Sequence, residues 1–149
     1  MKSIAKKRIA VFGSTGSVGS QTLEVIAAHP ELFEAEFLTA HTNDELLVEQ
    51  ALKFHPNAVV IGDEQKYPVV KKALAGTKVK VFAGEKALEE VASFDTYDMM
   101  VAAIVGFAGL RSVMKAIEHS LSDAKSRTRD LGGRATTEEV GKAIAAAIG

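Results

Sequence analysis

Near the start of the chain stands Arg8-Ile9-Ala10-Val11-Phe12-Gly13-Ser14-Thr15-Gly16-Ser17-Val18-Gly19. Apolar residues in an unbroken run after a basic one are typical of a strand that is buried on both faces. A helical spacing follows at Val18, Thr22, Leu23, Val25 and Ile26. The stretch therefore predicts a strand that runs into a helix through a glycine-rich turn.

The glycines of this turn suit the binding of a phosphate group. Gly13 can adopt backbone angles closed to other residues, Gly16 lets the main chain approach a ligand, and Gly19 lets the helix pack close to the strand. The first amides of the helix have no intrahelical partner and lie at the positive end of its dipole, where a phosphate can bind. Hydroxyl groups are expected to line the same place, from Ser14, Thr15 and Ser17.

The spacing Gly-x-x-Gly-x-x-Gly is a variant of the common dinucleotide fingerprint. A glycine pattern by itself can also mark a tight turn without a ligand, but its position between a strand and a helix favours dinucleotide binding. The triphosphate-binding motif Gly-x-x-x-x-Gly-Lys-Ser/Thr does not occur in the sequence. Hydrolysis of nucleoside triphosphates is therefore disfavoured.

The composition fits one globular domain. The chain has 149 residues, of which 47% are hydrophobic, and a formal net charge of -1. This charge gives no reason to expect nucleic acid or an anionic membrane as a partner, and no apolar run approaches the ~18 residues that a membrane span needs. The absence of cysteine excludes disulfides, thiolate metal sites and a cysteine nucleophile, and suits a cytoplasmic location.

Further along, segments with strand patterns alternate with segments that have helical spacing. Strands are expected within residues 33–40, best placed at 35–40, and at 58–61, 78–82 and 99–104. Helices are expected over residues 46–54 with Thr42 or Asn43 as the cap, and around 69–74, 85–92 and 107–117. This rhythm predicts an α/β fold, a doubly wound parallel sheet of the Rossmann type with helices on both faces.

In such a sheet the ligand lies across the carboxyl ends of the strands, where the strand order reverses. The residues just past the strands are therefore candidates, which gives Gly13 to Val18, then His41, Thr42 and Asn43, and last Ala102 to Gly106. No carboxylate stands at residues 40–43 to bond the ribose hydroxyls or to repel a 2′-phosphate. This absence favours NADP over NAD, although the matching arginine is missing too.

Two glycine-rich blocks carry a resemblance to a known family, residues 13–19 and residues 101–110, with Val48-Glu49-Gln50-Ala51 between them. Residues 8–119 resemble the N-terminal NADPH-binding region of the 1-deoxy-D-xylulose 5-phosphate reductoisomerases. The resemblance implies a role in converting 1-deoxy-D-xylulose 5-phosphate to 2-C-methyl-D-erythritol 4-phosphate, in the non-mevalonate isoprenoid pathway. It also implies NADPH and a divalent metal as cofactors of the full-length enzyme, and inhibition by fosmidomycin.

The same resemblance implies roles for particular residues. The pyrophosphate of NADPH would be held by Thr15, Gly16, Ser17 and Val18, within the turn that Gly13 opens. The adenosine ribose and its phosphate would lie near His41, Thr42 and Asn43. The nicotinamide side would be approached by Ala102 and Ala103. Family members often carry a lysine at the position of Thr42.

The resemblance to the reductoisomerases ends near residue 119. The Asn-Lys-Glu motif, the acidic metal ligands, the substrate loop and the C-terminal helical domain of the family are absent from this sequence. Residues 120–149 instead resemble the C-terminal end of the isopropylmalate and isocitrate dehydrogenases, through the string from Arg127 to Glu139. A fusion near Ile117 to Ser120, or a misread or truncated gene, would account for the change. We therefore expect a dinucleotide-binding domain at residues 1–119 and a foreign-looking loop and terminal helix at residues 120–149.

This last segment has the pattern of a helix with its cap. Thr136 and Glu139 fit a capping box. An apolar stripe with helical spacing follows it, formed by Val140, Ala143, Ile144, Ala147 and Ile148. We expect a terminal helix that docks on the sheet or on a second copy of the chain, so a homodimer is a possible assembly.

The sequence thus predicts the NADPH-binding domain of a reductoisomerase, with no catalytic residue and no metal ligand of its own. Such a chain would bind the cofactor at best. An alternative from a different class is a scaffold or assembly product in which the cofactor site is empty and the last segment drives association. A complete small dehydrogenase is disfavoured, because no general acid is expected near the nicotinamide position.

Overall fold

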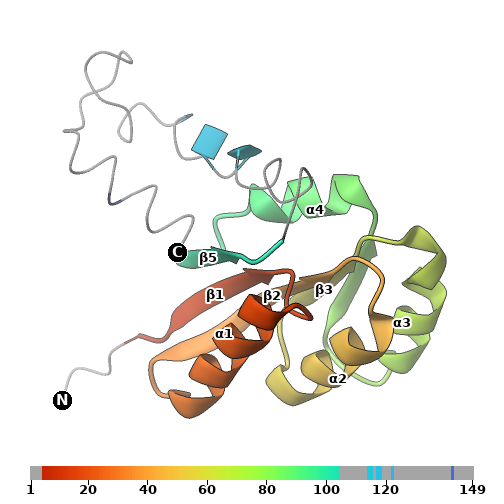
Figure 1. Cartoon of the computed structure of the whole chain (residues 1–149), viewed down its shortest axis with the longest axis horizontal. Helices are drawn as coiled ribbons and strands as arrows, with labels where there is room; N and C mark the ends of the chain where they lie inside the picture. The colour runs from red at the N-terminus through yellow and green to blue at the C-terminus, as the bar shows by residue number, and fades with distance from the viewer. Residues whose placement is uncertain (1–4, 105–113, 116, 119–121, 123–141, 143–149) are drawn as a thin grey trace.

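The computed structural model describes residues 5–104 together with Met114, Lys115, Ile117, Glu118, Ser122 and Lys142. Strands and helices alternate along the chain as the sequence predicts (Figure 1). In chain order the elements are β1 (Lys7–Phe12), α1 (Ser17–Ala28), β2 (Phe33–Ala40), α2 (Asp44–Phe54), β3 (Ala58–Ile61), the 3-10 helix η1 (Glu64–Lys66), α3 (Tyr67–Ala73), β4 (Lys80–Ala83), α4 (Glu85–Ala92) and β5 (Met99–Ala102).

The strands form one parallel sheet with the order β4-β3-β2-β1-β5. The chain moves outward from β1 through β2 and β3 to β4, and then returns to the other side of β1 to form β5 (Figure 1). The strand order therefore reverses between β1 and β5, as in a doubly wound sheet. This arrangement confirms the predicted α/β fold of the Rossmann type, and it places the ligand side at the carboxyl ends of these two strands.

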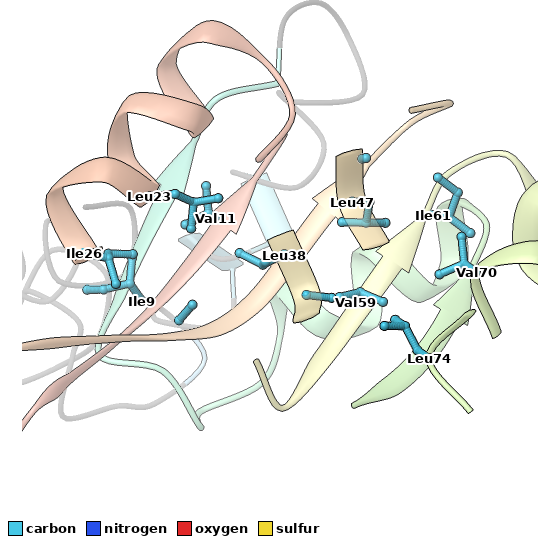
Figure 2. Packing of buried hydrophobic residues seen from close by; sticks show 13 residues of the cluster. Ile9, Val11, Leu23, Ile26, Leu38, Leu47, Val59, Ile61, Val70 and Leu74 are labelled. Atoms are coloured by element: carbon cyan, nitrogen blue, oxygen red, sulfur yellow. The ribbon is translucent and has the colours of Figure 1, made fainter. Parts of the chain in front are cut away.

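Each face of the sheet carries its own apolar core. Ile9 and Val11 of β1 pack with buried residues of α1, α2 and α3, and Figure 2 shows this packing with Leu23 and Ile26 beside β1. Ala10 and Phe12, which alternate with them, belong to a second core that includes residues of α4. Since successive side chains of a strand point to opposite faces, a strand covered on both faces needs an unbroken apolar run.

Several predicted boundaries are confirmed by the way the chain ends each helix. Helix α1 ends at Ala28, directly before His29 and Pro30. The cap of α2 is Asn43 rather than Thr42, because the Asn43 side chain accepts a hydrogen bond from the amide of Leu46 at 3.2 Å. At the other end of α2, His55 turns the chain away in a left-handed conformation with φ of 48°.

Two strand boundaries differ from the prediction. Strand β4 begins at Lys80 rather than at residue 78, because the amide of Val79 bonds the hydroxyl of Thr77 at 3.2 Å and continues a turn. Strand β5 ends at Ala102 rather than at residue 104, although the amide of Ala103 still donates to the carbonyl of Phe12 at 2.7 Å. Both strands are thus shorter than their apolar patterns.

Part of the prediction lies outside the described residues. Met114, Lys115, Ile117 and Glu118 are helical, in agreement with a helix after Gly106. Lys142 is helical and falls within the predicted terminal helix. The rest of both helices, the capping box and the boundary between residues 119 and 120 lie outside the described part. Among the helices that are described, none is both long and apolar enough to cross a membrane.

Candidate functional site

The carboxyl ends of three neighbouring strands bring the predicted site residues to one edge of the sheet. The segments that meet there are residues 13–19 after β1, which we call the glycine turn, residues 41–43 after β2, and residues 102–104 after β5. The amide of Ser14 donates to the carbonyl of Thr39 at 2.8 Å, and the amide of Ala103 donates to the carbonyl of Phe12 at 2.7 Å. The glycine turn is therefore bonded to its neighbour on the β2 side, and β5 ends beside it.

Two glycines of the turn are required by the fold itself. Gly13 has a φ of 81°, and a Cβ atom there would lie 2.8 Å from the carbonyl oxygen of Ala103. A Cβ atom on Gly19 would lie 2.1 Å from the carbonyl oxygen of Gly13. Both contacts are far shorter than van der Waals distance and involve backbone atoms. The structure thus confirms that Gly13 provides a special backbone conformation and that Gly19 lets α1 pack close to the turn.

Gly16 is different because the protein leaves space around it. A Cβ atom there would lie no closer than 3.5 Å to any atom, namely the carbonyl oxygen of Gly13, which is an ordinary contact. Gly16 has a φ of -80° and is the exposed N-cap of α1, and it has no side chain to cap the helix. Close approach of a ligand at Gly16 stays a prediction.

The backbone amides of the turn fall into two groups. The amide of Gly13 donates to the hydroxyl of Thr39 at 2.9 Å, and the amide of Gly16 donates to the carbonyl of Gly13 at 3.2 Å. Among the hydrogen bonds of the described residues, none involves the amides of Thr15, Ser17 or Val18. Helix α1 also has no acidic residue in its first turn, so within the described residues no carboxylate of this helix competes with an external anion for these amides.

The hydroxyl of Ser14 does not line this site, which corrects the sequence-based expectation. Ser14 is 0% exposed, and its Oγ donates to Oε1 of Gln50 in α2 at 2.7 Å. Only Thr15, which is half-buried, and Ser17, which is exposed, remain placed to offer hydroxyls. The direction of the Ser14 side chain depends on its partner in α2, which the motif does not contain.

The loop after β2 carries the other predicted residues in exposed positions. His41, Thr42 and Asn43 are all exposed. The imidazole of His41 lies against Gly62, where a Cβ atom would come within 2.6 Å of Nδ1. The carbonyl of His41 accepts a hydrogen bond from the amide of Asp63 at 2.8 Å, so this loop is joined to the loop after β3.

An ion pair at this loop was missed by the sequence analysis. Asp44, directly after Asn43, places its Oδ1 3.0 Å from Nζ of Lys66 in η1, and the Asp44 side chain is only 12% exposed. The hydrogen bond from Lys66 holds the pKa of the Asp44 carboxyl below its usual value, and Asp44 in turn raises the pKa of Lys66. The first carboxylate after β2 is thus already compensated. The two residues are far apart in sequence, so only an opposite-charge pattern between loops could have suggested the pair.

Ala102 and Ala103 lie beside the glycine turn, as their assignment to the same site requires. Ala102 ends β5 in register with Phe12, and the carbonyl oxygen of Ala103 lies close to Gly13. Neither residue carries a group for acid-base chemistry. In the described part of the chain, no three His, Asp or Glu side chains come together in a way that could hold a metal ion.

Comparison with known proteins identifies relatives of this fold and sequence. Residues 9–122 match the family model described as 1-deoxy-D-xylulose 5-phosphate reductoisomerase. The chain is 50% identical over 113 residues to the 1-deoxy-D-xylulose 5-phosphate reductoisomerase of Phocaeicola vulgatus, covering 76% of this chain and 30% of the relative. It is 38% identical over 136 residues to the protein of the same name from Chloroherpeton thalassium, covering 90% of this chain and 35% of the relative.

Solved structures give the same relationship. The chain resembles the reductoisomerase from Zymomonas mobilis in complex with NADPH, with a TM-score of 0.74, 31% identity and coverage of 86% of this chain and 37% of that one. It also resembles a reductoisomerase in complex with NADPH, fosmidomycin and magnesium, with a TM-score of 0.73, 33% identity and coverage of 76% of this chain and 28% of that one. The chain spans about a third of the length of the relatives that it matches, between 30% and 35% for the two sequences above.

Proposed function

Because the chain belongs to the 1-deoxy-D-xylulose 5-phosphate reductoisomerase family, we propose that it binds NADPH at the carboxyl ends of β1, β2 and β5. The observation that carries this proposal is the glycine turn. Gly13 holds a positive φ against Ala103, and within the part of the chain that the structure describes no hydrogen bond occupies the amides of Thr15, Ser17 and Val18 at the start of a helix. Backbone donors at a helix N-terminus are suited to a pyrophosphate.

The remaining contacts follow from the positions of the strands. The pyrophosphate lies at the amides of the glycine turn, between the loop after β2 and the end of β5. The adenosine ribose with its phosphate then falls on His41, Thr42 and Asn43, and the nicotinamide falls beside Ala102 and Ala103. NADPH supplies a hydride when it is bound, and the residues of this chain bind and orient it.

We propose the conversion of 1-deoxy-D-xylulose 5-phosphate only for a protein that also contains the remaining part of the family's sequence. The chain covers 30% of the Phocaeicola vulgatus relative, and Ala102 and Ala103, proposed to lie beside the nicotinamide, carry no acid-base group. We therefore assign cofactor binding to this chain, with no metal, and a cytoplasmic location that separation of cell fractions can test.

Calorimetric titration of the purified chain with NADPH, beside NADH, tests the proposal. Saturable binding that is tighter for NADPH is the expected result. Absence of heat with either nucleotide would contradict the proposal and favour the alternative of a scaffold with an empty site.

A pair of glycine variants makes the test specific to the turn. Gly16→Ala adds a methyl group where the protein leaves space for a ligand, while Gly76→Ala adds one where no atom lies within 4 Å. We expect Gly16→Ala to weaken NADPH binding and Gly76→Ala to leave it unchanged. Equal affinities of the two variants would count against phosphate binding at the turn.

The last segment is proposed to form a separate addition to the dinucleotide-binding domain, at residues 120–149, and to join two chains in a homodimer. Support comes from the apolar stripe in its sequence and from the family model, whose match ends at residue 122. The alignment with the Chloroherpeton thalassium relative spans 136 residues, so part of this segment aligns with that relative as well. Light scattering should show a dimer for the chain and a monomer for Ile144→Asp. A monomer at high concentration of the unchanged chain would contradict the proposal.

A further inference from the structure

Gln50 is a buried polar residue with bonds to a single distant residue. It lies in the middle of α2, is 7% exposed, and follows Ser14 by 36 positions in the sequence. Its Oε1 accepts a hydrogen bond from Ser14 Oγ at 2.7 Å, and its Nε2 donates to the Ser14 carbonyl at 2.9 Å. One side chain thus binds both the side chain and the main chain of Ser14.

The orientation of this amide follows from chemistry. A carbonyl oxygen can only accept a hydrogen bond, so the group of Gln50 that faces the Ser14 carbonyl has to be Nε2. The oxygen of the amide then faces the Ser14 hydroxyl, which can donate. The reciprocal pair has only one orientation in which both bonds form.

Fixing the Ser14 carbonyl also fixes the next amide. The described chain has no cis peptide bonds, and a trans peptide is planar with its carbonyl and N–H groups pointing in opposite directions. Gln50 Nε2 at 2.9 Å and Ser20 Oγ at 3.3 Å draw the Ser14 carbonyl into the protein. The N–H of Thr15 belongs to the same peptide and is therefore aimed away from the interior.

We propose that Gln50 is a positioning residue of the cofactor site. By binding the Ser14 carbonyl, it orients the N–H of Thr15 toward the pyrophosphate. The inference rests on the proposed binding of NADPH. Thr39 supports the preceding peptide, between Gly13 and Ser14, from β2, because its carbonyl accepts from the Ser14 amide at 2.8 Å. Gln50 differs from Thr39 because it binds the carbonyl of the Ser14 to Thr15 peptide itself, on which the direction of the Thr15 N–H depends.

Replacement of Gln50 by methionine separates the effect of its hydrogen bonds to Ser14 from the effect of its packing in the core. Gln50→Met keeps an unbranched side chain of similar length but removes both hydrogen bonds. The Ser14 carbonyl then loses its shorter bond, and the peptide can rotate before a ligand orders it. We expect NADPH to bind about tenfold more weakly, since one buried hydrogen bond of this kind commonly has that effect.

Leu74→Ala is the matched control for a loss of stability. Leu74 is 2% exposed and belongs to the core beside α3, away from the glycine turn. This variant should lower the urea midpoint, while the Kd for NADPH of the folded protein stays unchanged. Kd is measured by calorimetry under conditions in which circular dichroism shows every variant to be folded.

Gln50→Glu makes cofactor affinity depend on pH, which a purely structural role of Gln50 would not predict. An ionised carboxylate cannot donate to the Ser14 carbonyl, but a protonated one can replace both bonds of the amide. The groove above Gln50 is also lined by Glu24 of α1 and by Glu49 and Lys53 of α2. Burial and the two glutamates oppose ionisation of a glutamate at position 50, whereas Lys53 favours it. The affinity of Gln50→Glu for NADP⁺, relative to the unchanged chain, should therefore recover as the pH falls from about 8 to about 5.5.

The outcomes distinguish this inference from the function on which it rests. If the unchanged chain binds neither nucleotide, the proposed function fails and the role of Gln50 fails with it. If the unchanged chain binds NADPH and Gln50→Met binds it equally well, only the role of Gln50 is overturned. The same holds if Gln50→Met and Leu74→Ala weaken binding alike, or if Gln50→Glu shows no recovery in acid.

Discussion

The two ends of the proposed cofactor site are built in different ways. The glycine turn is held from inside by neutral hydrogen bonds of Ser14, Thr39 and Gln50, all of them buried. The loop after β2 is exposed, and beside it an ion pair joins Asp44 to Lys66, whose side chain is 43% exposed. Leaving a buried polar group without its hydrogen bond lowers stability, and salt does not change this effect. The attraction between partly exposed charges, in contrast, is screened by salt. The difference suggests that the first end sets the shape of the site and the second end sets its preference for charge.

The largest contrast is expected when a methyl group is added to a glycine at each end. In Gly19→Ala the new atom would meet backbone, 2.1 Å from the Gly13 carbonyl oxygen, so the turn or α1 has to shift. In Gly62→Ala, in the loop after β3 that is bonded to the loop after β2, the nearest neighbour at 2.6 Å is the His41 ring, an exposed side chain that can turn away. The Cα atom of His41, at 3.2 Å, has to give by only a few tenths of an ångström. We expect Gly19→Ala to lower the free energy of unfolding by about 3 kcal/mol and Gly62→Ala by less than about 1 kcal/mol. Urea unfolding measures both, and similar losses would remove the contrast.

A smaller effect is expected from removing one neutral bond behind the glycine turn. Thr39→Val keeps the shape of the side chain but leaves the Gly13 amide without the hydroxyl that accepts from it at 2.9 Å. The loss should be about 2 kcal/mol of the free energy of unfolding, together with weaker binding of NADPH. Thr22→Val is the control, because the Thr22 hydroxyl donates only to the Val18 carbonyl on the exposed side of α1. A Thr39→Val chain as stable as Thr22→Val would contradict the structural role given to Thr39.

A charge change tests the loop after β2. Lys66→Met leaves the Asp44 carboxylate without its partner beside the place proposed for the 2′-phosphate. NADPH affinity should fall about threefold relative to NADH at low salt, and the difference should shrink as salt is added. Competition titrations with both nucleotides measure the ratio. If the variant keeps the original ratio at every salt concentration, this ion pair does not contribute to selectivity.

The smallest effect is a local one in acid. Because the pKa of Asp44 is lowered by Lys66, its contribution to stability is complete above the ordinary aspartate pKa of about 3.9 and is lost as the pH falls through the lowered value. The bonds of Ser14, Thr39 and Gln50 have no titrating group and should persist over this range. Amide NMR between about pH 7 and about pH 3 should therefore show changes at residues 43–47 before residues 13–17.

Asp44→Asn provides the comparison for this titration, since it should abolish the early change at residues 43–47. Asp98 also has a lowered pKa, caused chiefly by the Arg8 amide that donates to its carboxylate. Asp98 directly precedes β5, at the edge of the sheet opposite the cofactor site, so a loss of its bond in acid should change the surroundings of Arg8 and Asp98 rather than either end of that site. Simultaneous changes at both ends of the cofactor site would show that global unfolding precedes the local effect.

Much of the fold was predictable because both faces of the sheet are covered. The unbroken apolar runs of β1 and β3 are buried as the pattern requires, and prolines 30 and 56 mark the ends of α1 and α2. The limits of β4 and β5 were less predictable. Apolar residues stand outside the paired range of each strand, Val79 before β4 and Ala103 and Ile104 after β5, and the hydrogen bond from Val79 to Thr77 decides where β4 begins.

The candidate site was predictable only in its outline. The glycine pattern placed the turn, and Gly13 and Gly19 have the roles that it predicted. Their partners could not be found from local patterns. Gln50 stands among the apolar positions of α2, and a polar residue in such a place is a signal of a buried partner, but nothing in the sequence says that the partner is Ser14.

The sequence by itself determined the order of the strands and helices, the glycine turn and the family to which the chain belongs. These features depend on neighbouring residues, through period, turn chemistry and motif, and so can be recognised along the chain. Only the tertiary structure decided that Ser14 faces inward, that Gln50 holds its peptide, and that Lys66 compensates Asp44. Those contacts join segments far apart in sequence, and their geometry exists only after the strands have paired and the helices have packed against the sheet.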